Sequence, residues 1–111
     1  YTPTINKLHI EGCLGTAIST KTANYTLTLN DSTILGNSSG GVITITLPEA
    51  SGLRGRQYTV KKIDSSGNNV IIARTSGTID GSSSVNLTAQ YKYLTCQTDG
   101  SSNWYIISTN V

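Results

Sequence analysis

The side chains of this 111-residue chain that are best suited to binding chemistry are aromatic and charged residues beside its predicted strand ends and turns. Tyr91 and Tyr93 flank Lys92, while Arg56 and Asp99 supply one charge of each sign. Flat aromatic faces with polar edges are a common platform for sugar rings, and adjacent polar groups can fix the orientation of a ligand. We therefore take Tyr91, Tyr93, Arg56 and Asp99 as candidate ligand-binding residues. The alternative role for the tyrosines is packing in a core or at an interface.

Residues that could perform catalysis are few and scattered. His9 is the only histidine, and no Ser or Cys near it forms a nucleophile motif. Asp64, Asp80 and Asp99 lie in predicted turns, where an aspartate usually accepts hydrogen bonds from nearby backbone N–H groups. A glycoside hydrolase needs two carboxylates that converge on one cleft. We predict no catalytic residues and no enzymatic activity, and a polysaccharide hydrolase is the least favoured function.

Metal and cofactor motifs are equally weak. Cys13, Cys96 and His9 do not have the spacing of a zinc site. The stretch from Asp64 to Asn68 is too sparse in oxygen ligands for a calcium loop and lacks its terminal glutamate. No glycine-rich stretch has the setting of a phosphate loop. We predict no metal and no cofactor, with both cysteines as free thiols and Cys96 as a small buried apolar residue.

The composition excludes several classes of partner. Charged residues make up 13% of the chain and the net charge is +2, so neither nucleic acid nor an acidic substrate is indicated. The pair Lys61-Lys62 fits a solvated strand face or charges at a subunit boundary. No apolar run approaches the length of a membrane span, which predicts no membrane insertion. The first residue is Tyr1 rather than Met, which indicates a chain excised from a longer polypeptide.

The elements that must position these residues are short β-strands. The segment from Val42 to Leu47 alternates apolar and hydroxyl side chains, which is the period of a strand with one buried face. Turn residues such as Asp64 to Asn69 and Asp99 to Ser102 separate similar segments. We expect strands at 24–29, 33–36, 42–47, 56–63, 70–73, 84–88, 91–98 and 104–108. The sequence predicts an antiparallel β-sandwich or jelly-roll-like domain of about eight to ten short strands.

The domain is predicted to cover residues 23–111, preceded by a segment at 1–22 that joins an upstream shaft or domain. The expected core follows the alternation within the strands: Leu27, Leu29, Ile43, Ile45, Leu47, Val60, Val70, Ile72, Val85, Leu87, Leu94, Cys96 and Ile106. Two strands are apolar at consecutive positions, which indicates burial on both faces. Because a small domain has one core, the second face suits another subunit. The candidate interface residues are Val70, Ile71, Ile72, Trp104, Tyr105 and Ile107.

An ordered set of motifs also resembles a known family. The set comprises Leu47-Pro48-Glu49-Ala50, Gly55 to Asp64, Ser66-Gly67-Asn68, Ile79-Asp80-Gly81, and Asp99-Gly100 before Asn103 to Ile107. In this order the motifs resemble the small β-domain near the C-terminus of bacteriophage tail fibres and tailspikes and of related large-virus fibre proteins. The resemblance covers roughly residues 42–108, about 60% of the chain.

The resemblance implies a homotrimeric virion protein. Domains of this family trimerise a fibre and cap its end, and they can contact the host-cell receptor. A carbohydrate-binding module for host-surface glycans is the alternative function, and its partner would be a glycan or a receptor protein. Both functions place the domain on the virion, exposed to the extracellular medium. Because one fold serves several functions, the family alone does not decide between them.

Overall fold

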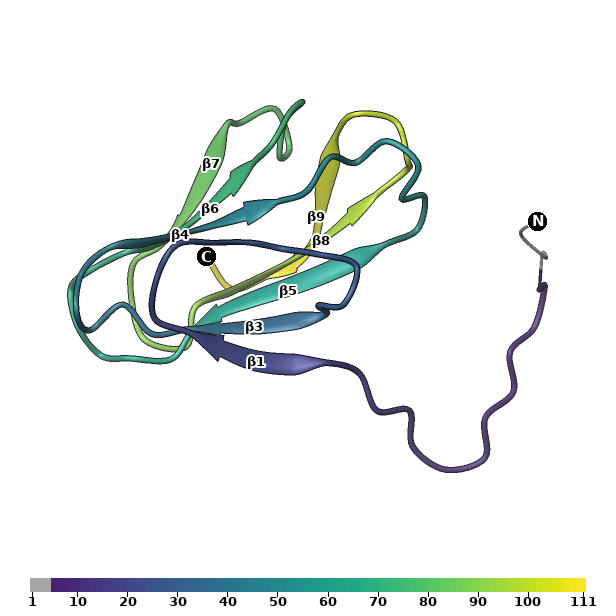
Figure 1. Ribbon diagram of the computed structural model, residues 1–111, viewed down its shortest axis with the longest axis horizontal. Coiled ribbons are helices and arrows are strands. Elements are labelled where there is room, and N and C mark those ends of the chain that lie inside the picture. Colours follow the sequence, from purple (N-terminus) through teal and green to yellow (C-terminus); the bar gives the residue numbers. More distant parts are fainter. Residues whose placement is uncertain (1–4) are drawn as a thin grey trace.

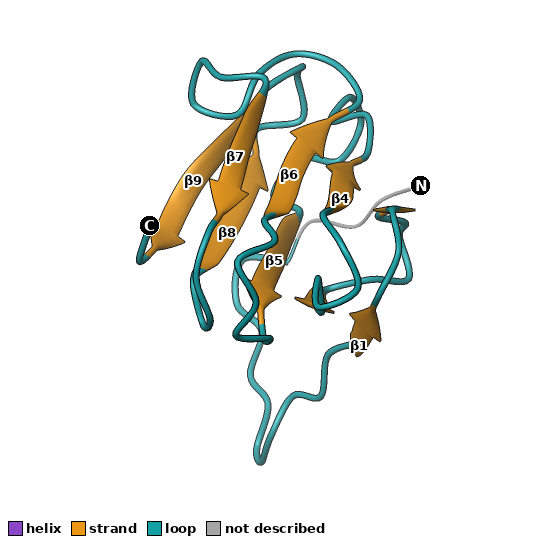
Figure 2. Ribbon diagram, turned by 90° about the vertical axis from the view of Figure 1, so that its left-hand side faces the viewer, coloured by secondary structure: helices purple, strands orange, loops and turns teal. Residues whose placement is uncertain are grey.

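The computed structural model describes residues 5–111, which form two β-sheets packed face to face (Figures 1 and 2). Sheet A has the spatial order β1 (Ile18–Lys21), β3 (Thr33–Gly36), β5 (Gln57–Lys62), β8 (Tyr93–Thr98) and β9 (Trp104–Thr109). Sheet B has the order β2 (Tyr25–Thr26), β4 (Ile43–Leu47), β6 (Val70–Arg74) and β7 (Ser84–Leu87). The described residues contain no helix, so the all-β class and the expected number of strands are confirmed.

The first six strands alternate between the two sheets. β1, β3 and β5 are parallel neighbours in sheet A, and β2, β4 and β6 are parallel neighbours in sheet B. The chain therefore makes three stacked coils, each with one strand per sheet. After β6 the pairing becomes antiparallel: β7 pairs with β6, β8 with β5, and β9 with β8. The domain joins a short parallel stack to an antiparallel end.

This topology corrects the prediction of an antiparallel sandwich. Of the expected hairpins, only β6–β7 and β8–β9 join consecutive strands of one sheet. The turn from Asp64 to Asn69 instead carries the chain from sheet A to sheet B. Aspartate and glycine permit a sharp turn in both settings, because their backbone preferences act locally. Whether the next strand pairs with the previous one is decided by packing between the sheets.

The core lies between the sheets and follows the alternation along each strand. Ile34, Val60 and Leu94 share one row across sheet A, and Ile45 and Ile72 share a row in sheet B. Most of the expected core residues are buried, while Val85 and Ile106 are half-buried against the core. Leu29 was predicted to be buried and is 65% exposed. The chain turns after Leu27, with Asp31 N–H donating to Thr28 O, so the strand alternation has already ended at Leu29.

Residues 5–17 form an extended segment that leaves the body of the domain ahead of β1 (Figure 1). We call residues 5–17 the arm. Residues 1–4 of the predicted N-terminal segment lie outside the described residues. β1 pairs with β3, so the sheet structure begins at Ile18, within the segment 1–22 that was expected to precede the domain.

Candidate functional site

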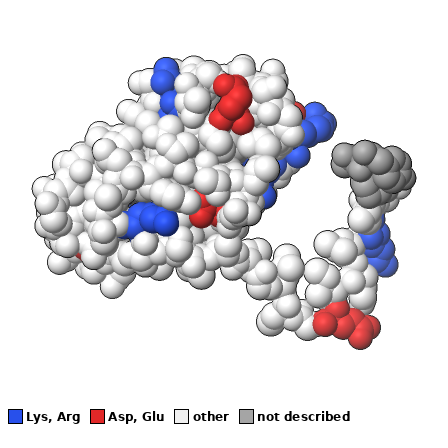
Figure 3. Space-filling view, in the orientation of Figure 1, with Lys and Arg blue, Asp and Glu red and all other residues white. Residues whose placement is uncertain are grey.

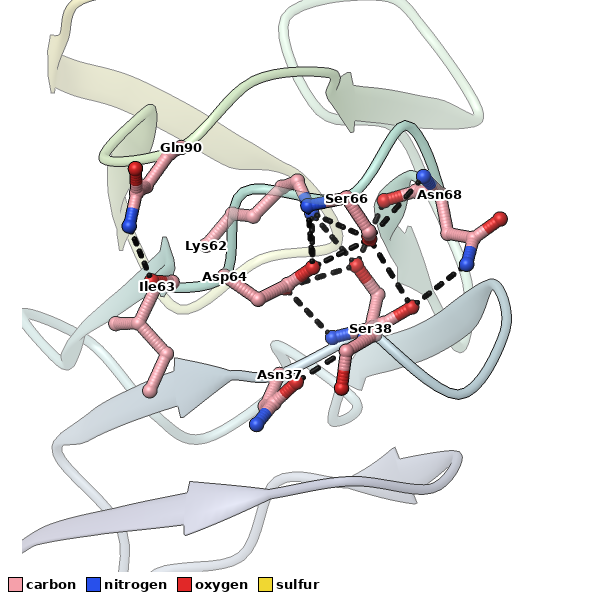
Figure 4. A network of polar contacts seen from close by, with 9 residues as sticks. Asn37, Ser38, Lys62, Ile63, Asp64, Ser66, Asn68 and Gln90 are labelled. Carbon is pink, nitrogen blue, oxygen red and sulfur yellow. Dashed lines mark hydrogen bonds and ion pairs between the residues drawn. The ribbon is translucent and has the colours of Figure 1, made fainter.

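The most extensive polar cluster is a buried network that joins two of the turns between the sheets (Figure 4). Lys62 at the end of β5 is fully buried, and its Nζ lies 2.8 Å from Asp64 Oδ2 and 2.8 Å from Ser38 Oγ. Asp64 Oδ1 accepts a hydrogen bond from the backbone N–H of Ser38 at 2.8 Å. Ser38 Oγ lies 2.6 Å from the carbonyl oxygen of Asn68, to which it can donate. The network thus fastens the β3–β4 turn to the β5–β6 turn of the next coil.

The electrostatics of this network favour an ionised carboxylate. Burial alone raises the pKa of Asp64, but hydrogen bonds from Lys62, Ser66 and two backbone N–H groups outweigh it and hold the pKa well below its usual range. The carboxylate is already fully engaged, so it is not available as a general base. Lys62 and Asp64 therefore serve structure, and the solvated strand face predicted for Lys62 is wrong.

Sequence reasoning missed this network, although a signal was present. Lys62 follows Val60 by two positions and therefore occupies an inward position of β5. An inward lysine requires a nearby acid, and Asp64 stands two residues further on. The predicted turn role of aspartates is confirmed here and at Asp99, because each accepts from the N–H two residues ahead, those of Ser66 and Ser101.

A second polar site lies beside an open groove of about 500 Å³ near the start of β5. Arg56 Nη2 donates to the carbonyl oxygens of Leu29, at 2.9 Å, and Asp31, and its guanidinium carbon lies 4.9 Å from the centre of the Tyr58 ring. The Asp31 carboxylate accepts from Tyr25 Oη at 2.6 Å and from Thr28 N at 2.9 Å. These contacts hold the turn that follows β2. Arg56 thus contributes to the fold at this groove.

The four predicted ligand-binding residues do not form one site. Arg56 precedes β5 and Asp99 follows β8, where Arg54 Nη1 reaches the Asp99 carbonyl oxygen at 3.3 Å. Tyr91 and Tyr93 lie at the opposite end of this strand pair, because Tyr93 pairs with Lys61 and Gln97 pairs with Gln57. Four residues of antiparallel strand separate the two ends by about 14 Å. The structure therefore divides the predicted patch in two.

Half of the predicted interface residues belong to the core of the chain itself. Val70, Ile72 and Trp104 are each 0% exposed, so their assignment to a subunit interface is wrong. Trp104 packs against Tyr58 with ring centres 5.6 Å apart, and its Nε1 donates to Pro48 O at 3.2 Å. The consecutive apolar residues arise because Ile71 and Tyr105 point away from the core while their neighbours point into it.

Two of the three remaining interface candidates, Tyr105 and Ile107, lie on β9, which pairs with β8 in sheet A, whereas Ile71 lies on β6 of sheet B. Leu94 and Cys96 of β8 and Trp104 of β9 point inward, so Tyr93 and Tyr105 point outward from sheet A. We define the tyrosine stripe as Tyr91, Tyr93, Tyr105 and Ile107. Tyr91 is 56% exposed, Ile107 50% and Tyr105 45%. Tyr93 Oη lies 2.7 Å from Ser108 Oγ, and Lys61 Nζ lies 5.4 Å from the centre of the Tyr91 ring.

The tyrosine stripe is the candidate functional surface of the domain. It combines apolar faces with hydroxyl and amide groups of β8 and β9. Within residues 5–111 no group of three His, Cys, Asp or Glu side chains is placed to hold a metal. Basic side chains are dispersed over the face shown in Figure 3 and form no continuous patch there.

No family model matches the chain, and a search of curated proteins finds no match to it. Residues 5–111 contain no helix that is long and apolar enough to cross a membrane.

Proposed function

We propose that this domain is the C-terminal cap and trimerisation module of a virion fibre or tailspike, exposed to the medium and able to contact the host-cell receptor. One observation supports the proposal above all others. The coils β1–β2, β3–β4 and β5–β6 stack in parallel, whereas β7, β8 and β9 are antiparallel. Further coils could be added beside β1 and β2 in the manner of a solenoid, while the antiparallel strands terminate the stack. That asymmetry suits the end of a fibre.

The proposed assembly is a homotrimer. The tyrosine stripe leaves large apolar side chains in water on a domain that already has a complete core, which favours contact with a second chain. The threefold count comes from the resemblance, since twofold dimers are the commoner oligomer in general.

Light scattering after size exclusion tests the assembly. Three chains of 11.8 kDa give about 35 kDa. A mass of one chain at micromolar concentration would contradict the proposal.

A second candidate function is recognition of a host-surface glycan by the tyrosine stripe. Its aromatic rings lie beside Thr95, Gln97 and Ser108, whose side chains can donate and accept hydrogen bonds. In a host-adsorption assay, Tyr91→Ala with Tyr93→Ala should reduce binding. Thr20→Ala, at the far edge of the same sheet, is the matched control and should not. Unchanged adsorption by the tyrosine variant would remove this candidate.

The proposal includes no enzymatic activity. Asp31 and Asp64 are both engaged by hydrogen bonds that favour their ionised forms, so neither suits the protonated general acid of a glycoside hydrolase. Incubation of the chain with host polysaccharide should yield no cleavage products. Cleavage that disappears with Asp31→Asn would contradict this part of the proposal.

A further inference from the structure

The open groove near the start of β5 has walls from three segments that lie far apart in the sequence. Residues 16–17 at the end of the arm form one wall, residues 29–32 of the turn after β2 form the second, and residues 55–57 form the third. The volume of about 500 Å³ lies within the range of ligand-binding clefts.

Hydrogen bonds hold these walls together. Thr33 N donates to Ala17 O at 3.0 Å, which ties the arm to the residues that follow the turn. Arg56 Nη2 donates to Leu29 O at 2.9 Å, which ties the third wall to the second. The groove is therefore formed by the fold itself, and a preformed site loses little free energy to ordering when a ligand binds.

Arg56 brings unused hydrogen-bond donors to this groove. A guanidinium has five N–H groups, and among the described residues only Nη2 of Arg56 finds acceptors, the carbonyl oxygens of Leu29 and Asp31. Arg56 Nε is buried without a partner, and within residues 5–111 it is the only buried side-chain nitrogen or oxygen in that condition. Nη1 has no partner there either, and because it is not buried as Nε is, it remains open to solvent. One nitrogen thus fixes the guanidinium while another is free to donate.

Asp31 brings an unused acceptor to the same groove. The residue is 9% exposed, and the side-chain hydrogen bonds that it accepts, from Tyr25 Oη and from Thr28 N and Oγ1, all reach Oδ2. Oδ1 accepts from none of the described residues, and it is not sealed from solvent. Burial raises the pKa of Asp31, but hydrogen bonds from Tyr25 and Thr28 outweigh it and lower the pKa, so the carboxylate is ionised at neutral pH.

The two charged groups select the class of ligand. A lone guanidinium would favour an anion and a lone carboxylate a cation, but together they give the groove no net charge. A hydroxyl group both donates and accepts, so neighbouring hydroxyls can serve Asp31 Oδ1 and Arg56 Nη1 at once through charge-assisted hydrogen bonds.

The neutral residues of the walls favour a ligand with many hydroxyls over a small zwitterion. A zwitterion would use the two charges and leave the other polar side chains idle, which are those of Thr16, Asn30, Ser32 and Gln57. Leu29, which is 65% exposed, offers an apolar contact for carbon-bound hydrogens.

We propose that this groove binds a neutral saccharide, with Arg56 Nη1 donating to one hydroxyl oxygen and Asp31 Oδ1 accepting from a neighbouring hydroxyl. Because the groove is open, it admits an internal part of a saccharide chain as well as its end. The site lies within a single chain, so it does not depend on the proposed trimer. It is also separate from the tyrosine stripe, since about 14 Å of β5 and β8 lies between Arg56 and Tyr93.

Nuclear magnetic resonance of the unaltered chain tests the site, with neutral trisaccharides of glucose, galactose, mannose and rhamnose as probes. At least one of them, at up to about 10 mM, should shift the backbone amide signals of residues 29–32 and 55–57. The Nε–H signal of Arg56 should shift with them, while the amide signals of Tyr91 and Tyr93 should stay in place. Absence of these shifts with all four trisaccharides would overturn the proposal.

A pair of variants tests the walls without disturbing the fold. Asn30 and Gln57 are exposed, and neither side chain forms a hydrogen bond with a described residue. Asn30→Ala with Gln57→Ala should weaken binding of the trisaccharide by about 10-fold or more, because two hydrogen bonds are lost. Ser84→Ala with Asn86→Ala, on the exposed positions of β7 in sheet B, is the matched control and should leave binding unchanged.

The remaining outcomes separate the groove from the other proposals. Shifts confined to the tyrosine stripe would overturn the groove and leave the stripe as the saccharide surface. A stronger response of the groove to trigalacturonate or to free alanine than to the neutral trisaccharides would overturn the ligand class. Equal weakening by the two double variants would overturn the assignment of the ligand to these walls. The mass of the assembly is measured separately, so failure of the groove leaves the trimer standing, and a monomeric chain leaves the groove standing.

Discussion

Replacement of Asp64 by asparagine should destabilise the domain strongly without changing its shape. Asp64 Oδ2 now accepts from Lys62 Nζ at 2.8 Å and from Ser66 N at 3.1 Å. If the amide nitrogen of the Asp64→Asn variant took that position, its N–H groups would face Lys62 Nζ and Ser66 N, which are themselves hydrogen-bond donors. If the amide turns instead, its nitrogen faces Ser38 N, which is also a donor. In either orientation the ammonium of Lys62, which is 0% exposed, loses its counter-charge.

The magnitude follows from the burial of the pair. Removing one partner of a buried ion pair lowers the free energy of unfolding by about 3 to 5 kcal/mol. A domain of this size has a total of about 5 to 15 kcal/mol. With a urea dependence of about 1.5 kcal/mol per molar, the midpoint should fall by about 2 to 3 M. Urea unfolding followed by circular dichroism measures this shift.

The double variant Lys62→Met with Asp64→Asn is the matched control. Because it removes both charges, it should recover at least half of the loss caused by Asp64→Asn alone. A loss below about 1 kcal/mol for Asp64→Asn would refute the reasoning that the pair is buried and coupled. A double variant that is no more stable than Asp64→Asn would refute the assignment of the loss to an unpaired Lys62.

The same carboxylate makes stability depend on pH. The pKa of Asp64 is lower in the folded chain than its ordinary value of 3.8, so the unfolded chain binds the proton first as the pH falls. Its contribution to stability is therefore complete above about pH 5 and is lost progressively as the pH falls through 3.8 toward the folded pKa. Asp64→Asn should lack this part of the acid dependence.

Three further predictions concern single side chains. Burial raises the pKa of Cys96 to about 12, so a thiol reagent at neutral pH should modify Cys13 alone in the isolated folded subunit and both cysteines after unfolding. The hydrogen bond from Tyr25 to the carboxylate of Asp31 raises the pKa of Tyr25 above 10.0. This hydrogen bond should therefore stabilise the fold below pH 10 and cease to do so as the pH rises through the folded pKa. An ultraviolet titration of the tyrosines measures the shift. Gly77→Ala should lower stability by more than about 1 kcal/mol in a thermal melt, because φ is +67° and a Cβ would lie 1.8 Å from a carbonyl oxygen.

Strand positions were predictable because they depend on local alternation. The expected strands at 42–47, 70–73 and 104–108 correspond to β4, β6 and β9 within one or two residues. Pairing was not predictable in this way. Asp64 to Asn69 and Asp99 to Ser102 have similar turn residues, yet the first connects the two sheets and the second closes a hairpin. The difference lies in which strands pair in the complete fold, and the turn residues alone do not encode that pairing.

The candidate surface was predictable only in part. The tyrosines of 91–93 and the apolar residues of 104–107 stood in separate predictions, one for a ligand and one for an interface. The antiparallel pairing of β8 with β9 brings exposed members of both groups onto one face of sheet A. Because neighbouring residues of a strand point to opposite faces, the sequence could have predicted that only one of Trp104 and Tyr105 faces the core. The register between β8 and β9 places the two groups on the same face, and neither segment alone predicts that register.

We propose that copies of this chain assemble in threes through the outer face of sheet A. Sedimentation equilibrium of the unaltered chain and of the Ile107→Glu variant, over a range of micromolar concentrations, tests it most directly. The account predicts about 35 kDa for the unaltered chain, three times 11.8 kDa, and a mass close to one chain for the variant. A single-chain mass for the unaltered protein throughout the range, or a trimer that Ile107→Glu leaves intact, would contradict it.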